Sequence, residues 1–231
     1  MLSRSKVLAA ALPRRALSTL AGAKFYRGEG DPSSRRVRIA LAEKGGIESF
    51  GVEEVMVDLG AMENRSDEFK RKTGSQQVPV LELADGEFLT QSMAIMKLID
   101  ALGPNEPSLF GSTPIQQARI EMAIRKLEAG LPAALFGAFQ HTSEFFAPRI
   151  TQIPEWGQHC ASQLPAKMDE LELELSDGKA YFAGDNFSAA DIAVIVALDF
   201  GKVLKCRPDP AAHPNLMAWL ERMKARPSYS A

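Results

Sequence analysis

Gln91 and Ser92 stand directly before an apolar run at helical spacing, 93–102, and this position favours the binding of an anion. The first N–H groups of a helix have no intrahelical partner, and the helix dipole makes this end positive, so it attracts a carboxylate. A polar residue at a helix start can instead cap the helix, which is the alternative interpretation of the pair.

A proline in the preceding segment could leave backbone groups free for a ligand. Residues 78–83 are apolar and β-branched, which predicts a strand, but Pro79 cannot donate a hydrogen bond to a sheet. We expect the Val78–Pro79 bond to be cis, with the N–H and C=O of Val78 available to an extended ligand. Asp85 and Gly86 then predict a two-residue hairpin turn.

The elements that must position these motifs alternate between strands and helices in the first half of the chain and are helical in the second. Apolar spacing and Gly or Pro punctuation predict strands at 24–26, 52–59 and 78–83, and helices at 33–44, 64–72 and 93–102. Beyond a Pro- and Gly-rich linker, helices are predicted at 114–140 with a bend near 130–132, at 154–176, at 192–204 and at 214–225. The prediction is therefore an α/β domain followed by an all-α bundle.

These motifs together resemble the cytosolic-type glutathione transferase family. The resemblance rests on the Val-Pro-x-Leu sequence at 78–81, the acidic-Gly turn and the polar-Ser pair, and on residues 36–45, which are similar to the first helix of tau, zeta and fungal-bacterial members. The capping box at 188–191 before an apolar helix is similar to the family's second domain. Residues 138–142 and 152–157 resemble bacterial and fungal members.

The resemblance covers residues 23–228 and implies the domain organisation of that family. A thioredoxin-like, glutathione-binding domain is expected at 23–102, a linker at 103–113, and an all-helical C-terminal domain at 114–231. By the same resemblance the protein is expected to form a homodimer.

The resemblance also assigns residues to glutathione. In the family, the residue before the cis-proline pairs its backbone with the cysteinyl unit, and the polar-Ser pair holds the γ-glutamyl carboxylate. Asn64 stands where many members have His or Lys near the glycyl carboxylate; it brings no charge, and Lys72 is the candidate to compensate. The residues expected to bind glutathione are Asn64, Gln77, Val78, Pro79, Gln91 and Ser92.

The thiol of glutathione must be activated, because a thiol with a pKa near ~8.5 is mostly protonated at neutral pH. Lowering this pKa by ~1.5–2 requires about 2–3 kcal/mol of thiolate stabilisation, which a hydroxyl at a helix N-terminus can supply. Asp31 and Pro32 occupy the positions of the family's activating Ser or Cys. Ser33 and Ser34 are the nearest hydroxyls, although Ser33 could instead cap the first helix. Tyr26 is a weaker candidate that fits the core better.

A histidine offers a second route to activation. In the fungal subgroup a water held by a histidine of the second domain takes the activating role, and His141 matches that histidine by motif. An imidazole can hold or deprotonate a water near neutral pH. The alternative is a structural histidine, which is also the interpretation of His159 and His213, each either structural or exposed.

The function implied by the resemblance is glutathione transfer in detoxification, in which the thiolate attacks a hydrophobic electrophile. The electrophile is expected to lie on Phe136, Phe139 and Phe145, with Phe146 beside them. Asp31 and Asn64 motivate the alternative of a glutathione-fold binding or interaction module with little or no conjugating activity. Glutathione-dependent isomerase or peroxidase activity is a lesser variant.

Composition excludes several other classes of function. The 231 residues are 45% hydrophobic and 24% charged with a formal net charge of −2, which gives no electrostatic basis for binding nucleic acid. Cys160 and Cys206 have no metal-ligand spacing and are expected to be free thiols in a reducing compartment. No segment has the length of a membrane span. We expect no metal and no cofactor, with glutathione as a co-substrate.

The first 22 residues differ in character from the rest of the chain. They contain Ser and Thr, no acidic residue, and the basic residues Arg4, Lys6, Arg14 and Arg15. This composition is typical of a mitochondrial or plastid transit peptide, and Pro13 interrupts the apolar run that a secretory signal would need. We expect residues 1–22 to be a transit peptide, with a disordered tail on a cytoplasmic protein as the alternative.

Overall fold

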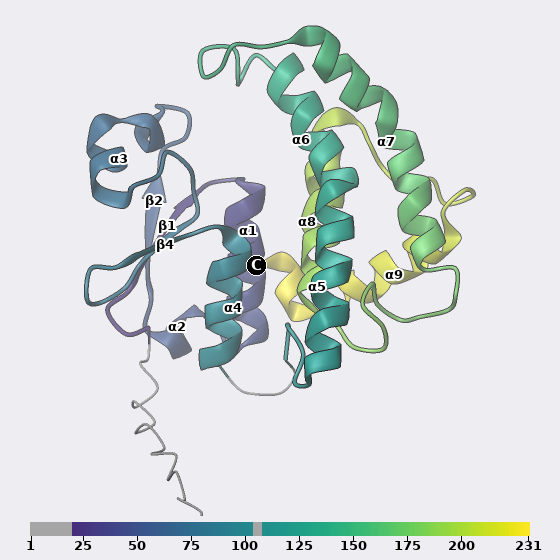
Figure 1. Cartoon of the computed structure of the whole chain (residues 1–231), viewed down its shortest axis with the longest axis horizontal. Coiled ribbons are helices and arrows are strands. Elements are labelled where there is room, and N and C mark those ends of the chain that lie inside the picture. The colour runs from purple at the N-terminus through teal and green to yellow at the C-terminus, as the bar shows by residue number, and fades with distance from the viewer. Residues whose placement is uncertain (1–19, 104–107) are drawn as a thin grey trace, which may run out of the picture.

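A computed structural model describes residues 20–103 and 108–231, and Figure 1 shows two parts that lie side by side. The first part holds a small mixed sheet, and the second is helical, as the sequence predicts. Residues 1–19 of the expected transit peptide lie outside the described residues; Leu20 is buried, and the N–H of Gly22 donates to the Gly51 carbonyl at 3.2 Å. Among the described residues, no helix is long and apolar enough to cross a membrane.

The sheet contains four strands in the order β2-β1-β3-β4. β1 pairs in parallel with β2, whereas β1 with β3 and β3 with β4 are antiparallel. The strands are β1 (Lys24–Gly28), β2 (Glu53–Val57), β3 (Val80–Glu82) and β4 (Phe88–Thr90). The predicted second strand is therefore longer than the observed one.

The hairpin differs from the predicted two-residue turn. Glu82 pairs with Phe88, and the N–H of Leu83 still donates to the Glu87 carbonyl at 2.8 Å, so three residues form the loop. Only the glycine of the predicted pair, Gly86, has a positive φ, at 87°. The predicted loop is one residue too short. The bond between Leu83 and Glu87 continues the antiparallel ladder beyond the strand ends and leaves residues 84–86 in the loop.

Helices cover both faces of the sheet. The helical elements of this part are α1 (Pro32–Glu43), α2 (Ile47–Phe50), η1 (Glu63–Arg65), α3 (Asp67–Thr73) and α4 (Ser92–Leu102). Strand alternation places Phe25 and Leu81 in the large core with α1 and α4, and Tyr26 and Val80 in a second cluster with Phe69 of α3. Tyr26 is therefore a core residue on the α3 face, and its hydroxyl contacts Glu82 and Lys72.

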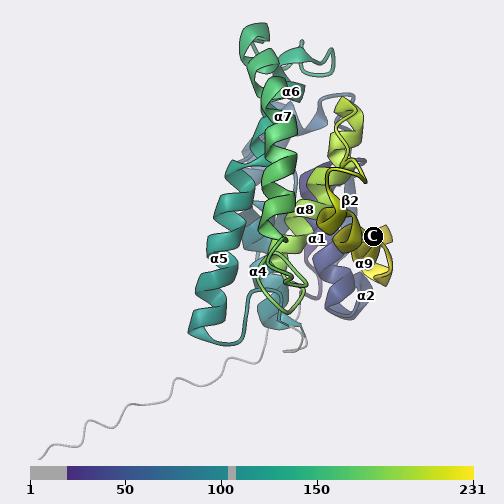
Figure 2. The same cartoon turned by 90° about the vertical axis from the view of Figure 1, so that its right-hand side faces the viewer.

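The second part is a bundle around α8. Its helices are α5 (Pro114–Ala129), α6 (Leu131–Thr142), α7 (Pro154–Glu174), α8 (Ala189–Gly201), η2 (Lys202–Leu204), α9 (Pro214–Lys224) and η3 (Pro227–Ser230). The predicted bend near residue 130 is the break between α5 and α6. Residues 189–198 of α8 are all buried, which confirms the expectation of a central apolar helix. Helices α6 and α7 pack along each other, and α5 leads into α6 (Figure 2).

The capping box of α8 is formed by Ser188 and Asp191 and is fully buried. Asp191 accepts hydrogen bonds from the N–H of Ser188 at 2.9 Å, from the Phe182 N–H at 3.1 Å and from the Trp219 indole at 3.0 Å. Burial raises the pKa of the Asp191 carboxyl to about 6, although these donors oppose the shift. The box thus ties the start of α8 to α9 and to the preceding loop.

Helix α1 joins the two parts. It packs on α4, on α8 and on η3. Arg35 of α1 forms an ion pair with Asp199 of α8, and Arg226 forms a bidentate pair with Glu43 at 2.7 and 2.9 Å. Ion pairs near both ends of α1 therefore hold it against the second part of the molecule.

Candidate active site

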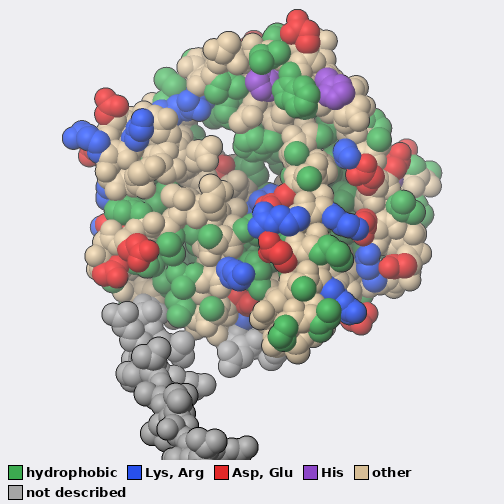
Figure 3. Space-filling view, viewed as in Figure 1, with side chains coloured by type: hydrophobic (Ala, Val, Ile, Leu, Met, Phe, Trp, Pro, Cys, Tyr) green, Lys and Arg blue, Asp and Glu red, His purple; other side chains and the backbone are tan. Residues whose placement is uncertain are grey.

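A cavity of about 450 Å³ lies where the β4–α4 junction and α1 meet α5. This volume falls within the range of about 300–1,000 Å³ that is common for small-molecule sites. Figure 3 shows a hollow between the two halves of the molecule, with charged side chains beside it. The residues that line the cavity are Ser33, Arg36, Ser75, Gln77, Val78, Pro79, Thr90, Gln91, Ser92, Met93, Ala94, Lys97, Phe110, Glu121, Ile124, Arg125 and Glu128.

Six of the residues predicted from the sequence share this cavity. The five around the hairpin come together because one short segment carries them: Gln77, Val78, Pro79, Gln91 and Ser92. Ser33 joins them from α1. The bond between Val78 and Pro79 is cis, as expected.

The start of α4 lies at the cavity. Gln91 precedes the helix with a φ of 71°, a left-handed conformation that costs energy for a non-glycine residue. Its side chain makes no capping hydrogen bond, and Ser92 lies inside the first turn rather than at the cap position. Ser92, Met93 and Ala94 all line the cavity. The start of α4 therefore agrees better with the binding of an anion than with the interpretation of Gln91 and Ser92 as a helix cap.

The start of α1 separates the two candidate serines. Asp31, not Ser33, caps the helix, because its carboxylate accepts the Ser34 N–H at 2.6 Å. Burial raises the pKa of Asp31, and its hydrogen bonds to Ser34 oppose that rise. Ser34 is 1% exposed, and its Oγ accepts the Gly28 N–H at 3.4 Å. Of the two hydroxyls, Ser33 is the one that lines the cavity.

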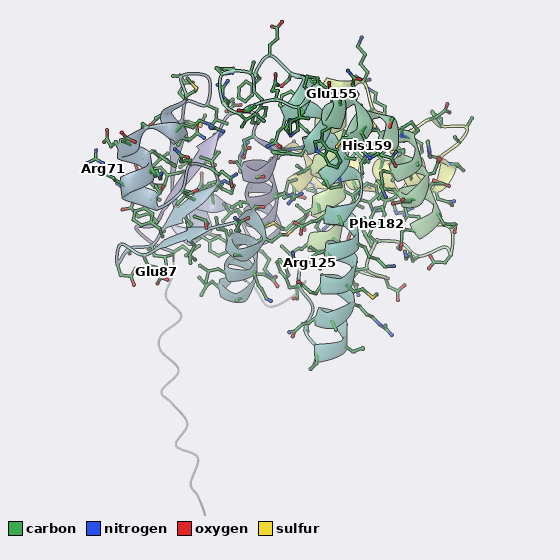
Figure 4. The ribbon with its side chains drawn as sticks, turned by 45° about the horizontal axis from the view of Figure 1, so that its top comes forward. Arg71, Glu87, Arg125, Glu155, His159 and Phe182 are labelled. Atoms are coloured by element: carbon green, nitrogen blue, oxygen red, sulfur yellow. The ribbon has the colours of Figure 1, made fainter. Side chains whose placement is uncertain are left out.

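Charged residues of α1 and α5, which sequence reasoning missed, form the opposite wall. Arg36 pairs with Glu128 at 3.3 Å, and Arg125 pairs with Glu121 at 2.8 Å and with Glu128 at 3.2 Å. Figure 4 shows Arg125 on the side of α5 that faces α4. Burial lowers the pKa of Arg36, and its Nε is buried with no hydrogen-bond partner in the described structure. The spacing of 121, 125 and 128 along one helix face was the available sequence signal.

Asn64 does not line the cavity. Its side-chain amide donates to the Gln76 carbonyl at 2.6 Å, which connects η1 to the segment that leads into Val78. Lys72 hydrogen-bonds to Tyr26 on the far face of the sheet, and this bond is the largest cause of its raised pKa. In this structure the two side chains support the sheet and the loop beside it.

His141 also lies outside the cavity lining. Its Nδ1 accepts the N–H of Ile153 at 3.0 Å, so a neutral ring carries its proton on Nε2. His213 is 7% exposed and lies between the Asp209 N–H and the Asp169 carboxylate. His159 stacks on Trp156. His213 is therefore structural, while the activating role of His141 stays a prediction.

The predicted phenylalanines form one aromatic cluster. Phe139 lies 6.1 Å from Phe145, 5.5 Å from Phe146 and 5.1 Å from Phe200 between ring centroids, and Phe136 lies 6.0 Å from Phe200. Phe200, at the end of α8, was missed because its predicted helix is apolar on every side. Phe136 and Phe145 are 38% and 40% exposed. The cluster is an apolar surface on the α6 side of the molecule.

No group of His, Cys, Asp or Glu in the described part of the chain has the arrangement of a metal site. Both cysteines are free thiols, as the sequence indicates. The polar side chains that line the cavity are hydroxyls, amides and charged groups.

Comparisons with known proteins agree with this architecture. Residues 21–101 match the family model "Glutathione S-transferase, N-terminal domain", and residues 157–227 match "Glutathione S-transferase, C-terminal domain". Glutathione S-transferase 2 of Saccharomyces cerevisiae is 37% identical over 88% of this chain and 86% of its own length. A maleylacetoacetate isomerase of Pseudomonas aeruginosa is 29% identical over 83% of this chain and 92% of its own.

A solved structure resembles the whole described fold. The crystal structure of a glutathione S-transferase domain-containing protein from Marinobacter aquaeolei has 36% identity and a TM-score of 0.82, covering 89% of this chain and 99% of that one. The matched models span most of both parts of the molecule, in the order that the fold requires. The chain belongs to the glutathione S-transferase family.

Proposed function

We propose that the protein is a glutathione transferase that conjugates the thiolate of glutathione to a hydrophobic electrophile. The observation that carries this proposal is the convergence of the Val78 backbone, the uncapped start of α4 and the Ser33 hydroxyl on one cavity. The γ-glutamyl carboxylate binds at Ser92, and the cysteinyl unit lies along Val78. This placement brings the sulfur toward α1.

Ser33 stabilises the thiolate by donating its O–H to the sulfur, with the positive end of α1 adding to the effect. For an aryl halide, the sulfur–carbon bond forms, the carbon–halogen bond breaks, and the halide leaves with the electron pair. The thiol proton passes to solvent. The half-buried Asp31 carboxylate accepts the Ser34 N–H, which offsets part of its negative charge at the start of α1.

In the experiment, the full chain is applied to a glutathione resin, and its conjugation of glutathione to 1-chloro-2,4-dinitrobenzene is then measured. Retention on the resin together with formation of the aryl thioether supports the proposal. Retention without turnover favours a binding module, and an absence of retention contradicts both functions. Turnover of maleylacetoacetate in place of conjugation would favour an isomerase, an activity that one relative's name states.

The proposed assembly is a homodimer, and the proposed location is a mitochondrion or plastid. The first is checked by light scattering of the purified protein, which should give twice the mass of one chain. The second is checked by expressing residues 1–22 in front of a fluorescent protein; diffuse fluorescence in the cytoplasm would contradict it.

A further inference from the structure

The segment between α6 and α7 crosses to the sheet-bearing part of the molecule and is fastened there. Nη2 of Arg149 donates to the carbonyl of Leu59 at 2.7 Å and to that of Gly60 at 3.3 Å. In return, Nη1 of Arg65 donates to the Arg149 carbonyl at 2.7 Å. Two arginines from opposite parts thus bind backbone carbonyls of each other's loops.

The crossing segment is held together by hydrogen bonds of its own. The N–H groups of Arg149 and Ile150 both donate to the Phe146 carbonyl, at 2.9 and 3.1 Å. At its ends it is tied to α6, where Gln152 donates to the carbonyls of Gln140 and Ser143, both at 2.8 Å. Residues 144–151 therefore form a compact unit between two anchored ends.

This unit carries part of the aromatic cluster. Phe145 and Phe146 belong to it, whereas Phe136 and Phe139 belong to α6. The guanidinium of Arg149 lies 3.8 Å from the centroid of the Phe145 ring, and that ring stacks on Phe139 with an interplanar angle of 20°. The rings of Phe145 and Phe146 therefore contact those of α6, and the unit covers this part of the cluster.

The point of fastening is next to the start of α1. A Cβ atom on Gly28, the last residue of β1, would lie 2.3 Å from the Leu59 side chain. Leu59, whose carbonyl binds Arg149, therefore packs against the strand that leads to Ser33. The unit is consequently anchored to a loop that packs against the strand leading to the start of α1.

We propose that residues 144–151 form a lid over the aromatic cluster, and that Arg149 and Arg65 hold it closed and thereby limit the size of the apolar molecule that enters. The lid itself does not depend on the proposed function; only the identity of its occupant as the electrophile does. Opening requires the three hydrogen bonds to Leu59, Gly60 and Arg149 to break. Removing the Arg149 side chain removes two of these bonds and the cation above Phe145.

The test uses two neutral fluorescent probes, because their binding needs neither glutathione nor catalysis. N-phenyl-1-naphthylamine is the smaller probe and Nile red the larger. In the full chain, Arg149→Ala should strengthen the binding of Nile red by about tenfold and that of the smaller probe by less than about threefold. Amide exchange in 144–151 should become about tenfold faster, since the segment opens more often.

Three further variants make the result specific. Arg222→Ala is the matched control, because Arg222 also donates to a backbone carbonyl, that of Ala180 at 2.9 Å, away from the cluster. Arg149→Lys, which keeps the charge but not the two-carbonyl geometry, should fall between wild type and Arg149→Ala. Adding Phe139→Ala to Arg149→Ala should remove the gain in Nile red binding.

If Arg149→Ala and Arg222→Ala show the same selectivity between the two probes and the same amide exchange in 144–151, the proposal of a lid is wrong. If Arg149→Ala does not fold, Arg65→Ala removes a single bond and should shift both readouts in the same direction by a smaller factor; no shift would also overturn the proposal. A wild-type protein that conjugates no electrophile contradicts the proposed function alone, because the probe and exchange results still decide the lid.

Discussion

Arg36 of α1 and Glu128 of α5 form an ion pair, 3.3 Å between Nη1 and Oε1, across the two parts of the molecule. Their side chains are 15% and 27% exposed, so the pair is largely withdrawn from water. Both residues of the pair line the cavity, and Glu128 also forms an ion pair with Arg125. The pair thus contributes both to the contact between the parts and to the shape of the site.

Glu128→Gln should lower the free energy of unfolding by about 2 kcal/mol, because it leaves the buried charge of Arg36 without its partner. For a chain of this size, that corresponds to a fall in Tm of about 4–8 °C. Glu121→Gln is the control, since Glu121 pairs with the exposed Arg125. Calorimetry of the two variants checks the prediction, and equal Tm values would contradict it.

Ser33→Ala should lower kcat at pH 7 by about 10- to 100-fold under the proposed function, because the thiolate loses about 2–3 kcal/mol of stabilisation. The affinity for glutathione should change little. Above about pH 9 the difference in rate should disappear, since the thiol then ionises without help. The measurement is a profile of kcat against pH for wild type and variant.

The competing route makes the opposite prediction for the same experiment. If His141→Ala lowers kcat while Ser33→Ala leaves it unchanged, a water held by His141 activates the thiol. Ser33→Thr serves as the conservative variant, because a second hydroxyl at this position should restore most of the rate.

Ser92→Ala should weaken the binding of glutathione by about tenfold, which corresponds to ~1.4 kcal/mol for a hydrogen bond to a charged group. The backbone N–H groups of α4 remain, so binding should not be abolished. Ser49→Ala, at an exposed serine whose hydroxyl donates locally to the Gly46 carbonyl, is the control. Titration calorimetry measures both, and a loss below about twofold for Ser92→Ala would contradict its role.

Proximity in sequence explains which parts of the site could be predicted. Val78 and Ser92 are joined by one hairpin, so local patterns place both at the same end of α4. The pairing of Arg36 with Glu128 depends instead on how α1 meets the bundle, and neither residue differs in its local pattern from an exposed helical charge. Arg149 was missed for the same reason, because contacts between distant elements leave no periodic signal.

Both helix starts left a local signal in the sequence. The box at Ser188 and Asp191 was predictable from spacing, since both residues belong to one turn. The alternative that Ser33 caps α1 was wrong, although the position of Asp31 before Pro32 carried the signal for the cap. Proline at the first helical position makes the preceding aspartate a natural cap.

Asp191 should make stability depend on pH in the direction opposite to most carboxylates. Its pKa is about 6 in the folded protein and near 3.8 otherwise, so the folded state binds this proton more tightly. Between about pH 4 and pH 6, the free energy of unfolding should therefore fall by about 3 kcal/mol from this group as the pH rises.

Asp191→Asn should lose this dependence, and it should be less stable at all pH values because its amide N–H groups face the donors of Ser188. Urea unfolding of both proteins from pH 4 to pH 7 isolates the contribution, since other groups cancel in the difference. A difference that stays constant with pH would show that the hydrogen bonds from Ser188, Phe182 and Trp219 outweigh burial and keep the carboxyl ionised.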